Sequence, residues 1–416
     1  MLDRTLAPPS NQIQRPKFPV TDELFINDIP VVLLNQGNQP VTLFELVIPV
    51  GRWHEPKPGL SYFLFKMITE GTKNKSASEI ASTFDFYGSH LEVTPTLDNV
   101  SIKLYSLNKF LPKVLPLLIS LLSESIFPER EFVTLKQIRS QQIKQQLARN
   151  NVYASMKFRE MLFGENHPYG FMLSPEAVDD ISLDDVVSFE DALLVRPRIF
   201  ISGQIDELVL TAVSQALEDA SFGKVLASST HDISASNRQT IVREDSTQAS
   251  IRIGKLAIDK HHDDIHQLKI TNTLLGGYFG SRLMKNIREE KGLTYGIHAS
   301  IINLEKFSYW AISSEIQKSK IELAKTEILK EVERLANNEP GEKEMLMLKN
   351  YTRGKFLSSF DSPFSSHEMI KGLLLANLDT IYLQNFLDTL DRIQPNDISE
   401  MTKKHLVEGL SELVVY

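Results

Sequence analysis

The apolar and polar positions along the chain predict short strands alternating with helices. Residues 41–50 alternate in β-branched and polar residues, which is typical of a strand. Residues 58–70 carry apolar side chains at the spacing of one helix face, and a second helix is expected over 77–87, where Ser76 and Glu79 have capping-box spacing. The same reasoning predicts strands at 89–95 and 99–107 and helices at 110–124 and 129–149.

The second half of the chain runs in the same order. It is expected to hold a strand at 249–258, helices at 263–275 and 281–291, strands at 293–302 and 307–315, and two long helices around Pro340. Gly88 and Gly292 end matching helices 204 residues apart, and Pro128 and Pro340 precede matching long helices 212 residues apart. This near-constant offset indicates two copies of one α+β unit.

The expected organisation is therefore an arm and two homologous domains. Residues 1–22, with four prolines among the first twenty, form an extended arm, and the domains cover 23–190 and 199–416. Each domain is expected to be an antiparallel sheet with its helices packed on one face. Two such halves leave a cleft between them, which is a natural place for a ligand.

Composition narrows the function. The chain of 416 residues has 45 Lys and Arg against 53 Asp and Glu, a net charge of −8, which argues against non-specific nucleic-acid binding. It has no cysteine, so it has no disulfide, thiol nucleophile or Cys-ligated zinc. No window reaches the roughly 18–20 apolar residues of a membrane span. We expect a cytoplasmic protein, or a periplasmic one if a leader was removed.

Two segments resemble a known family. The segment GRWHEPKPGLSYFLFKMITEGT resembles the opening of the pitrilysin/insulinase-type zinc peptidases, the H-x-x-E-H group. The frame residues of that opening are Gly51, Glu55, Gly59, Leu60, Gly71 and Thr72. Further on, LLGGYFGSRLMKNIREEKGLTYGIHAS resembles the second-half signature of the same family. The resemblance implies the two-domain α+β fold of processing peptidases and LuxS-like metalloenzymes.

The chain departs from that family at the zinc site. Tyr62 and Lys66 stand at the two histidine positions, Phe65 at the catalytic glutamate, and Gln137 at the third ligand by the expected register. Zinc needs three protein ligands and an open position for water, which these side chains do not provide. We therefore expect no metal and no hydrolysis by this chain alone. The plainer interpretation is that Tyr62, Phe65 and Lys66 simply pack within a helix.

The second signature retains candidate substrate-binding residues. In the resembled family an Arg and a Tyr of this motif, here Arg288 and Tyr295, reach across the cleft and donate hydrogen bonds near the scissile carbonyl. The alternative is that Arg288 pairs with a neighbouring glutamate and Tyr295 fills a strand. Gly276 and Gly277 form a short glycine-rich turn. The zinc-free chains of mitochondrial processing peptidases have a longer glycine-rich loop near this position that contacts substrate. The alternative is that these glycines permit a tight turn or a close backbone approach.

A histidine-rich segment is a second candidate metal site. His261, His262 and His266 lie in DKHHDDIHQ, and the last two are spaced four apart. The segment is polar and precedes a helix, so a solvated helix start is the favoured interpretation. Asp263 and Asp264 suit the positive end of that helix without a metal.

The expected function is that of a non-catalytic subunit. In two-chain members of the family one chain carries the zinc and the other carries the Arg/Tyr pair, which is the pattern of this sequence. It would pair with an H-x-x-E-H homologue. This chain would hold no cofactor, and the zinc would be bound by the partner. An unfolded peptide would bind along a sheet edge. The alternatives are a structural scaffold and a peptide-binding homodimer without catalysis.

Overall fold

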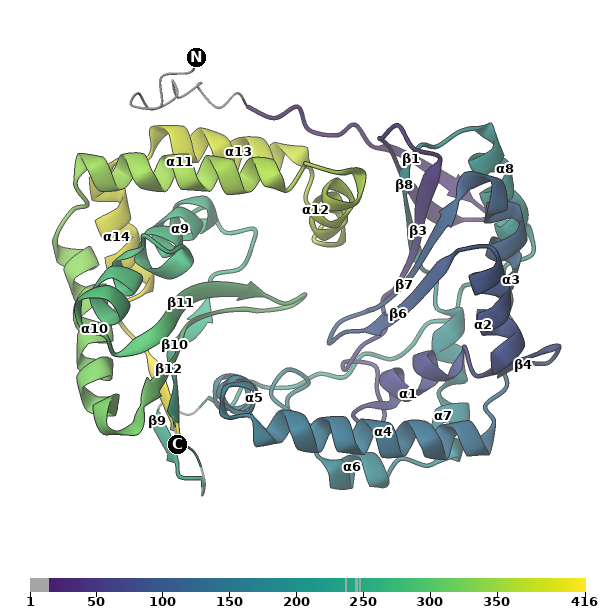
Figure 1. Cartoon of the computed structure of the whole chain (residues 1–416), viewed down its shortest axis with the longest axis horizontal. Helices are drawn as coiled ribbons and strands as arrows, with labels where there is room; N and C mark the ends of the chain where they lie inside the picture. The colour runs from purple at the N-terminus through teal and green to yellow at the C-terminus, as the bar shows by residue number, and fades with distance from the viewer. Residues whose placement is uncertain (1–14, 236–237, 244–245, 247) are drawn as a thin grey trace, which may run out of the picture.

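The computed structural model of the chain describes residues 15–235, 238–243, 246 and 248–416. Figure 1 shows two lobes side by side, each built on one β-sheet with helices around it. The mixed α+β class with two sheet-and-helix domains is thereby confirmed. No helix within these ranges is long and apolar enough to cross a membrane.

The N-terminal lobe contains a six-stranded sheet in the order β1-β2-β8-β3-β7-β6. Only the β2–β8 pairing is parallel. The strands are β1 (Asp22–Ile26), β2 (Ile29–Asn35), β3 (Val41–Ile48), β6 (His90–Pro95), β7 (Val100–Leu107) and β8 (Arg198–Gly203). A two-residue pair, β4 (Gly71–Thr72) and β5 (Lys75–Ser76), stands apart. Strand β6 is therefore an open edge of the sheet.

Helices cover one face of this sheet because their apolar stripes match its inward-facing positions. Helices that contribute buried side chains to the core include α1 (Leu60–Met67), α2 (Ala77–Phe86), α3 (Leu111–Ser123), α7 (Leu183–Ser188) and α8 (Glu207–Glu218). The long helix α4 (Glu129–Ala148) and the short α6 (Pro175–Asp179) flank them. The expected capping box at the start of α2 is present, with the Ser76 and Glu79 side chains bonding each other's backbone N–H groups.

The C-terminal lobe repeats the plan with a five-stranded sheet in the order β11-β12-β10-β13-β9. Its strands are β9 (Arg238–Ile241), β10 (Gln248–Ala257), β11 (Thr294–Asn303), β12 (Ser308–Gln317) and β13 (Ser411–Val415). Its core face packs against α9 (Ile265–Asn272), α10 (Ile321–Asn337), α14 (Pro395–His405) and the π-helical turns η3 (Thr273–Gly277) and η4 (Met284–Glu290). Strand β11 is the open edge that corresponds to β6.

The boundary between the two units differs from the one expected. Strand β8 lies between β2 and β3, and β13 lies between β9 and β10, each parallel to one neighbour and antiparallel to the other. The first unit therefore runs through β8 and α8, beyond residue 190, and the second begins at β9 rather than at 199. The apolar run Ile199–Ile201 says that a strand is present but not which sheet it joins, because pairing is decided by tertiary contacts.

Each lobe's own helices pack on one face of its sheet, as expected, and helices of the other lobe cover the second face. Helix α5 (Asn150–Phe163) packs against Leu413 and Val415 of β13 in a shared apolar cluster. Reciprocally, α11 (Glu342–Ser358), α12 (Pro363–Leu375) and α13 (Thr380–Arg392) pack against Val32 and Phe200. Figure 1 shows α5 and α12 between the two sheets. The exchange makes the lobes one packed body.

A buried polar network adds to this connection. Glu45 of β3 is fully buried and contacts His367 Nε2 and the Lys371 ammonium, both from α12. The other ring nitrogen of His367, Nδ1, lies 2.7 Å from the Ser202 hydroxyl of β8. These bonds satisfy polar groups that would otherwise be costly to bury.

The described part of the arm lies on the C-terminal helices. Arg15 pairs with Asp388 of α13 at 2.7 Å, and the Phe18 ring meets the Phe356 and Phe360 rings edge-on. The rest of the expected arm, residues 1–14, lies outside the described residues. Residues 15–21 have no regular structure before β1, consistent with an extended connection.

Candidate functional site

Helix α1, which carries the degenerate zinc motif, is started by two residues of the family frame. Gly59 precedes the helix with φ of 101°, a left-handed conformation that glycine adopts at no steric cost. The Glu55 carboxylate accepts hydrogen bonds from the N–H groups of Gly59 at 2.8 Å and Ser61 at 3.0 Å. A carboxylate is favourable there because it meets the positive end of the helix. Both frame residues therefore have a structural reason to be present without any metal.

The position of the catalytic base belongs to the hydrophobic core. The Phe65 side chain is fully buried among apolar residues of the N-terminal lobe. It carries no group that could take a proton from water. The packing interpretation of Phe65 is thereby confirmed.

Tyr62 and Lys66 share the other face of α1, and each contacts a different partner. The guanidinium carbon of Arg139, on α4, lies 4.1 Å from the centre of the Tyr62 ring, which is cation–π geometry. Burial raises the pKa of Tyr62, against the opposing charge of Arg139, so the phenol stays protonated at neutral pH. The Lys66 ammonium donates a 2.5 Å hydrogen bond to the carbonyl of Val93. Burial lowers the pKa of Lys66, with a further decrease from Arg139.

The residue that α4 presents to this face is Arg139, and not Gln137 as expected. Gln137 is exposed, while Arg139 is partly buried over Tyr62. Two residues along an α-helix turn the side chain by roughly 200°, so the two positions face opposite sides. A register taken from motif spacing cannot fix such an angle when the intervening loops differ in length.

These side chains do not fit zinc. Zinc in peptidases is held by three neutral imidazole or anionic ligands, with a water in the fourth position. Here the corresponding positions offer a protonated phenol at Tyr62 and cations at Lys66 and Arg139, and two positive charges repel a dication. No step of peptide hydrolysis can be derived through a metal at this position.

Lys66 also restricts the open edge of the N-terminal sheet. Thr96 N–H donates to the Asn99 carbonyl at 2.8 Å, which makes 96/99 a hydrogen-bonded pair at the β6–β7 turn. Antiparallel pairs alternate, so Val93 directs its N–H and C=O away from β7 toward the open edge. Lys66 occupies that carbonyl, and Pro95 has no N–H to offer. A peptide adding along β6 would lack part of the usual ladder.

In the Arg/Tyr motif of the C-terminal lobe, Tyr295 is exposed and Arg288 stacks on an aromatic ring. Tyr295 lies on the edge strand β11 with 91% of its surface exposed. The β11–β12 register shifts between Thr294 and Ile297, so Tyr295 sits in a bulge. The Arg288 guanidinium lies 4.6 Å from the centre of the Phe279 ring. Within the described ranges Arg288 forms no ion pair, including with its glutamate neighbours, so the pairing alternative is not observed.

The two glycines of the turn before Arg288 have different surroundings. A Cβ on Gly276 would lie 2.7 Å from both the Cβ and the N of Ala299 on β11, so this position needs close backbone approach. Gly276 is buried, which leaves it no surface for a peptide. A Cβ on Gly277 would meet only the Thr273 side chain, at 3.3 Å. The expected close backbone approach is therefore confirmed for Gly276.

The histidine-rich segment does not converge on a metal. His266 packs against the Tyr382 ring at 4.4 Å, while His262 lies near the His405 ring. Asp264 immediately precedes α9 and bonds Lys404 and His405 instead of capping the helix backbone. This agrees with the helix-start interpretation.

One group of potential metal ligands occurs elsewhere in the described chain, formed by Glu45, His367 and Glu368. Lys371 bridges the two carboxylates at 2.9 and 2.8 Å, and Lys103 bonds Glu368 at 2.7 Å. The ammonium groups already balance the negative charge. The group therefore acts as an ion-pair network between the lobes.

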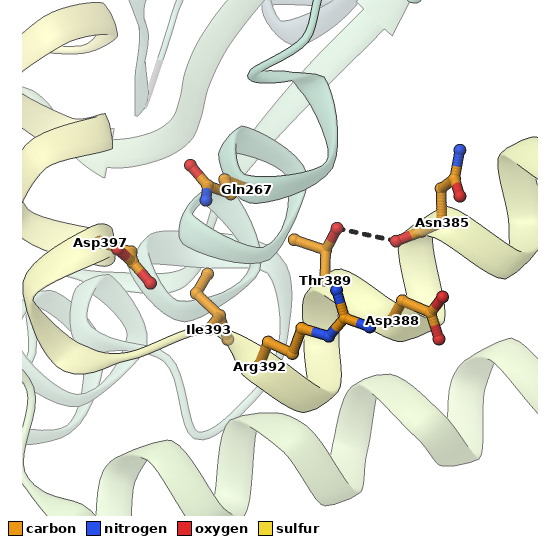
Figure 2. Close-up of a pocket in the computed structure, with 7 residues that line it drawn as sticks. All are labelled: Gln267, Asn385, Asp388, Thr389, Arg392, Ile393 and Asp397. Atoms are coloured by element: carbon orange, nitrogen blue, oxygen red, sulfur yellow. Dashed lines mark hydrogen bonds between the residues drawn. The ribbon is translucent and has the colours of Figure 1, made fainter.

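A surface cavity of about 290 Å³ lies between α9 and α13, away from both motifs. Figure 2 shows the residues that line it: Gln267 on α9, Asn385, Asp388, Thr389 and Arg392 on α13, and Ile393 and Asp397 beyond the end of α13. The hydrogen bond drawn there joins the Thr389 hydroxyl to the Asn385 carbonyl one turn earlier, at 2.7 Å. The cavity's two carboxylates are engaged as well, because Asp388 pairs with Arg15 and Asp397 accepts from the Gln394 N–H at 2.8 Å.

Sequence reasoning missed the basic residues around Tyr62. Arg52 follows β3, Arg139 is on α4 and Arg159 is on α5, and no motif links them. The available signal was the helical period of α4, which puts Arg139 seven residues beyond Phe132 on the same face. The contact with α5 could not be read from sequence because α5 packs across the lobes.

Comparison with known proteins agrees with the fold and the motifs. Residues 30–165 match the model of the insulinase family, peptidase family M16, and residues 181–351 match the M16 inactive domain. An uncharacterized zinc protease YmxG of Bacillus subtilis is 24% identical over 279 residues, covering 66% of this chain and 68% of that protein. A non-peptidase homolog YmxG of Helicobacter pylori is 24% identical over 299 residues, covering 67% and 68%.

Solved structures show the same fold. The crystal structure of an M16 inactive domain from Pseudomonas fluorescens superposes with a TM-score of 0.85 at 21% identity, covering 95% of this chain and 98% of that one. The two family models together span most of the chain, in the order that the two signatures require. The chain therefore belongs to the M16 peptidase family.

Proposed function

We propose that this chain is a non-catalytic M16 subunit that pairs with a zinc-bearing homologue and supplies hydrogen-bond donors to the peptide. The observation that carries the proposal is the exposed Tyr295 hydroxyl on the edge strand β11. A tyrosine with 91% of its surface exposed contributes little to packing. Its hydroxyl is free to reach a second molecule.

Arg288 supports the same role. Its guanidinium rests on the Phe279 ring and has no carboxylate partner in the part of the chain that the structure describes. Donors such as a guanidinium and a phenol stabilise the oxygen that becomes negative when a peptide carbonyl is attacked. The water and the metal for that attack would come from the partner chain, because α1 of this chain offers neither ligand nor base.

An unfolded peptide would add as a strand to β11, the open edge of the C-terminal sheet. Backbone hydrogen bonds along an edge strand give affinity with little dependence on sequence. The equivalent edge of the other lobe, β6, is less suited because Lys66 occupies the Val93 carbonyl. Because of this difference, the peptide would bind to the sheet edge of the C-terminal lobe rather than to that of the N-terminal lobe.

A structural scaffold is the second candidate function, and one observation favours it. The reciprocal packing of α5 and α12, with the buried Glu45–His367 contact, fixes the two lobes against each other. A body held in this way could serve an assembly that contains no peptide. The third candidate, a peptide-binding homodimer, needs Tyr295 but no zinc-bearing partner.

Reconstitution separates the three functions. The purified chain is mixed with an H-x-x-E-H homologue from the same genome, and cleavage of an unstructured peptide is compared with that by each chain alone. Cleavage that needs both chains supports the proposal. Peptide binding without cleavage in any mixture would favour the homodimer, and a stable complex with neither would favour the scaffold.

A further inference from the structure

Basic side chains lie near the degenerate zinc position, and we call four of them the basic cluster: Arg52, Lys66, Arg139 and Arg159. They come from the loop after β3 and from α1, α4 and α5. Arg139 lies over Tyr62 and within charge–charge range of Arg52 and Lys66, and Arg159 lies within that range of Arg52. Arg139 stacks on Tyr62, and Lys66 is one helical turn further along α1. Burial, together with the charges of Arg159 and Arg139, lowers the pKa of Arg52 to about 10 against the opposing charge of Glu55. The cluster therefore gathers like charges.

The cluster lacks anionic partners. Arg52 donates to the carbonyls of Pro168 at 3.1 Å and Phe171 at 2.6 Å, which are neutral. The buried Nε atoms of Arg139 and Arg159 have no hydrogen-bond partner among the described residues. No member of the cluster forms a salt bridge within the same ranges.

The nearest carboxylates are already engaged. Both oxygens of Glu55 accept backbone N–H groups at the start of α1. Glu92 accepts a hydrogen bond from the Thr94 hydroxyl at 2.9 Å. A buried N–H of a charged group is costly when it is left unsatisfied, and a second or third nearby cation adds repulsion. A bound anion would relieve both costs at once.

We propose that the basic cluster binds a carboxylate group of an extended acidic peptide. A guanidinium donates two parallel hydrogen bonds to a carboxylate, and Arg139 is already fixed in place by the Tyr62 ring. The outward-facing N–H of Val93, beside Lys66, can donate to a carbonyl of the same peptide. The site is separate from Tyr295, so it goes beyond the proposed role of the C-terminal lobe.

The overall charge favours a peptide over a polyanion. The chain carries a net charge of −8, which repels a long negative polymer at distance. A local cationic site within an acidic body instead selects a ligand with few carboxylates. Those carboxylates can be Asp or Glu side chains or the peptide's C-terminus, which offer the same chemistry.

Fluorescence anisotropy of the full chain, without any partner, tests this binding. Four short unstructured peptides carry a neutral dye. Two sequences are used, one rich in Glu and one with Gln at the same positions, and each is made with a free and with an amidated C-terminus. We expect the Glu peptides to bind at least ~10-fold more tightly than the amidated Gln peptide, and more weakly as salt is added. Tight binding of the free-C-terminus Gln peptide would identify the C-terminal carboxylate as the ligand.

Two variants locate the site. Arg139→Gln and Lys66→Met are each expected to weaken the Glu peptide ~10-fold. The matched control is Arg130→Gln, which removes an exposed arginine from the same helix α4 and should leave the affinity unchanged. The Glu peptide should also raise the melting temperature of the wild type and of Arg130→Gln, and less that of Arg139→Gln.

Several outcomes would overturn the inference. Equal binding of all four peptides, or none by any, would do so with the wild type alone, whether or not the variants fold. Unchanged affinity in folded Arg139→Gln and Lys66→Met would place the binding elsewhere. Because no zinc-bearing chain is present, these results leave the test of the proposed subunit role unaffected.

Discussion

The guanidinium carbon of Arg139 stands 4.1 Å from the centre of the Tyr62 ring, so a cation from α4 covers the first ligand position of the zinc motif. Lys66, at the second ligand position, adds another positive charge. These two positive charges repel a dication. Glu55 and Gly59 start α1 beside them.

The first prediction concerns zinc. Purified wild-type chain should contain far less than one zinc per chain at this site by elemental analysis. The triple variant Tyr62→His, Lys66→His, Arg139→Glu should bind zinc, because it restores three ligands on facing helices. The matched control places the glutamate at Gln137 instead and should bind at least ~100-fold more weakly. Equal affinity of the two variants would show that the register on α4 is not the one described.

The second prediction concerns acid stability. Burial by itself would raise the pKa of Glu45, but the hydrogen bond from His367 and the charge of Lys371 outweigh it and lower the pKa to about 2. A carboxyl with a lowered folded-state pKa stabilises the fold above its unfolded pKa near 4.5, and this contribution is lost as pH falls toward 2. At neutral pH it amounts to roughly 3 kcal/mol.

Urea unfolding of the wild type and of Glu45→Gln at several pH values measures that contribution. The variant should be less stable by roughly 3–5 kcal/mol at pH 7, because one partner of a buried ion pair is lost. The difference should shrink as pH falls from about 5 to about 2. Glu165→Gln, at an exposed position, serves as the control and should show little difference at any pH. A pH-independent gap for Glu45→Gln would contradict the ion-pair assignment.

The third prediction separates packing from substrate contact at the glycine turn. Gly276→Ala should lower the free energy of unfolding by about 1–3 kcal/mol, because its Cβ would overlap Ala299 on β11. Gly354→Ala, in α11 with open space around it, should stabilise by up to ~1 kcal/mol. Chemical denaturation measures both. A fully stable Gly276→Ala protein would argue against the close approach to β11.

The fourth prediction concerns assembly. The exposed Tyr295 and Phe279, 91% and 62% accessible, lie near the β11 edge and are expected to be covered in a complex. Light scattering should show this chain with a zinc-bearing homologue as a complex of one copy of each. A strict monomer, alone and with every homologue from the same genome, would count against the subunit role.

Much of the fold could be predicted from the sequence because it depends on local patterns. The strand over 41–50 and the helix over 129–149 appear close to their expected bounds, as β3 and α4. The capping box at Ser76 placed α2 to within a residue or two. Such features depend on side chains a few positions apart, which a single sequence displays directly.

The rest depends on contacts between distant segments. The sheet that β8 joins and the packing of α5 and α12 on the opposite lobe are set by tertiary pairing, which no local period encodes. At the site, Gln137, expected at the third ligand position within a few residues, is exposed, whereas Arg139, two residues further along α4, lies over Tyr62. The basic cluster could not be foreseen because its members lie on four separate segments.

The most direct measurement is the turnover of a reconstituted complex with Tyr295→Phe. The wild-type zinc-bearing homologue is combined with wild-type or variant copies of this chain and assayed on one unstructured peptide. If Tyr295 donates to the developing oxyanion, kcat should fall by roughly 10²–10³-fold with a smaller change in KM. The variant removes one hydroxyl from an exposed side chain, so folding and assembly should be unchanged. Unchanged kcat in an intact complex would contradict the donor role and favour the scaffold.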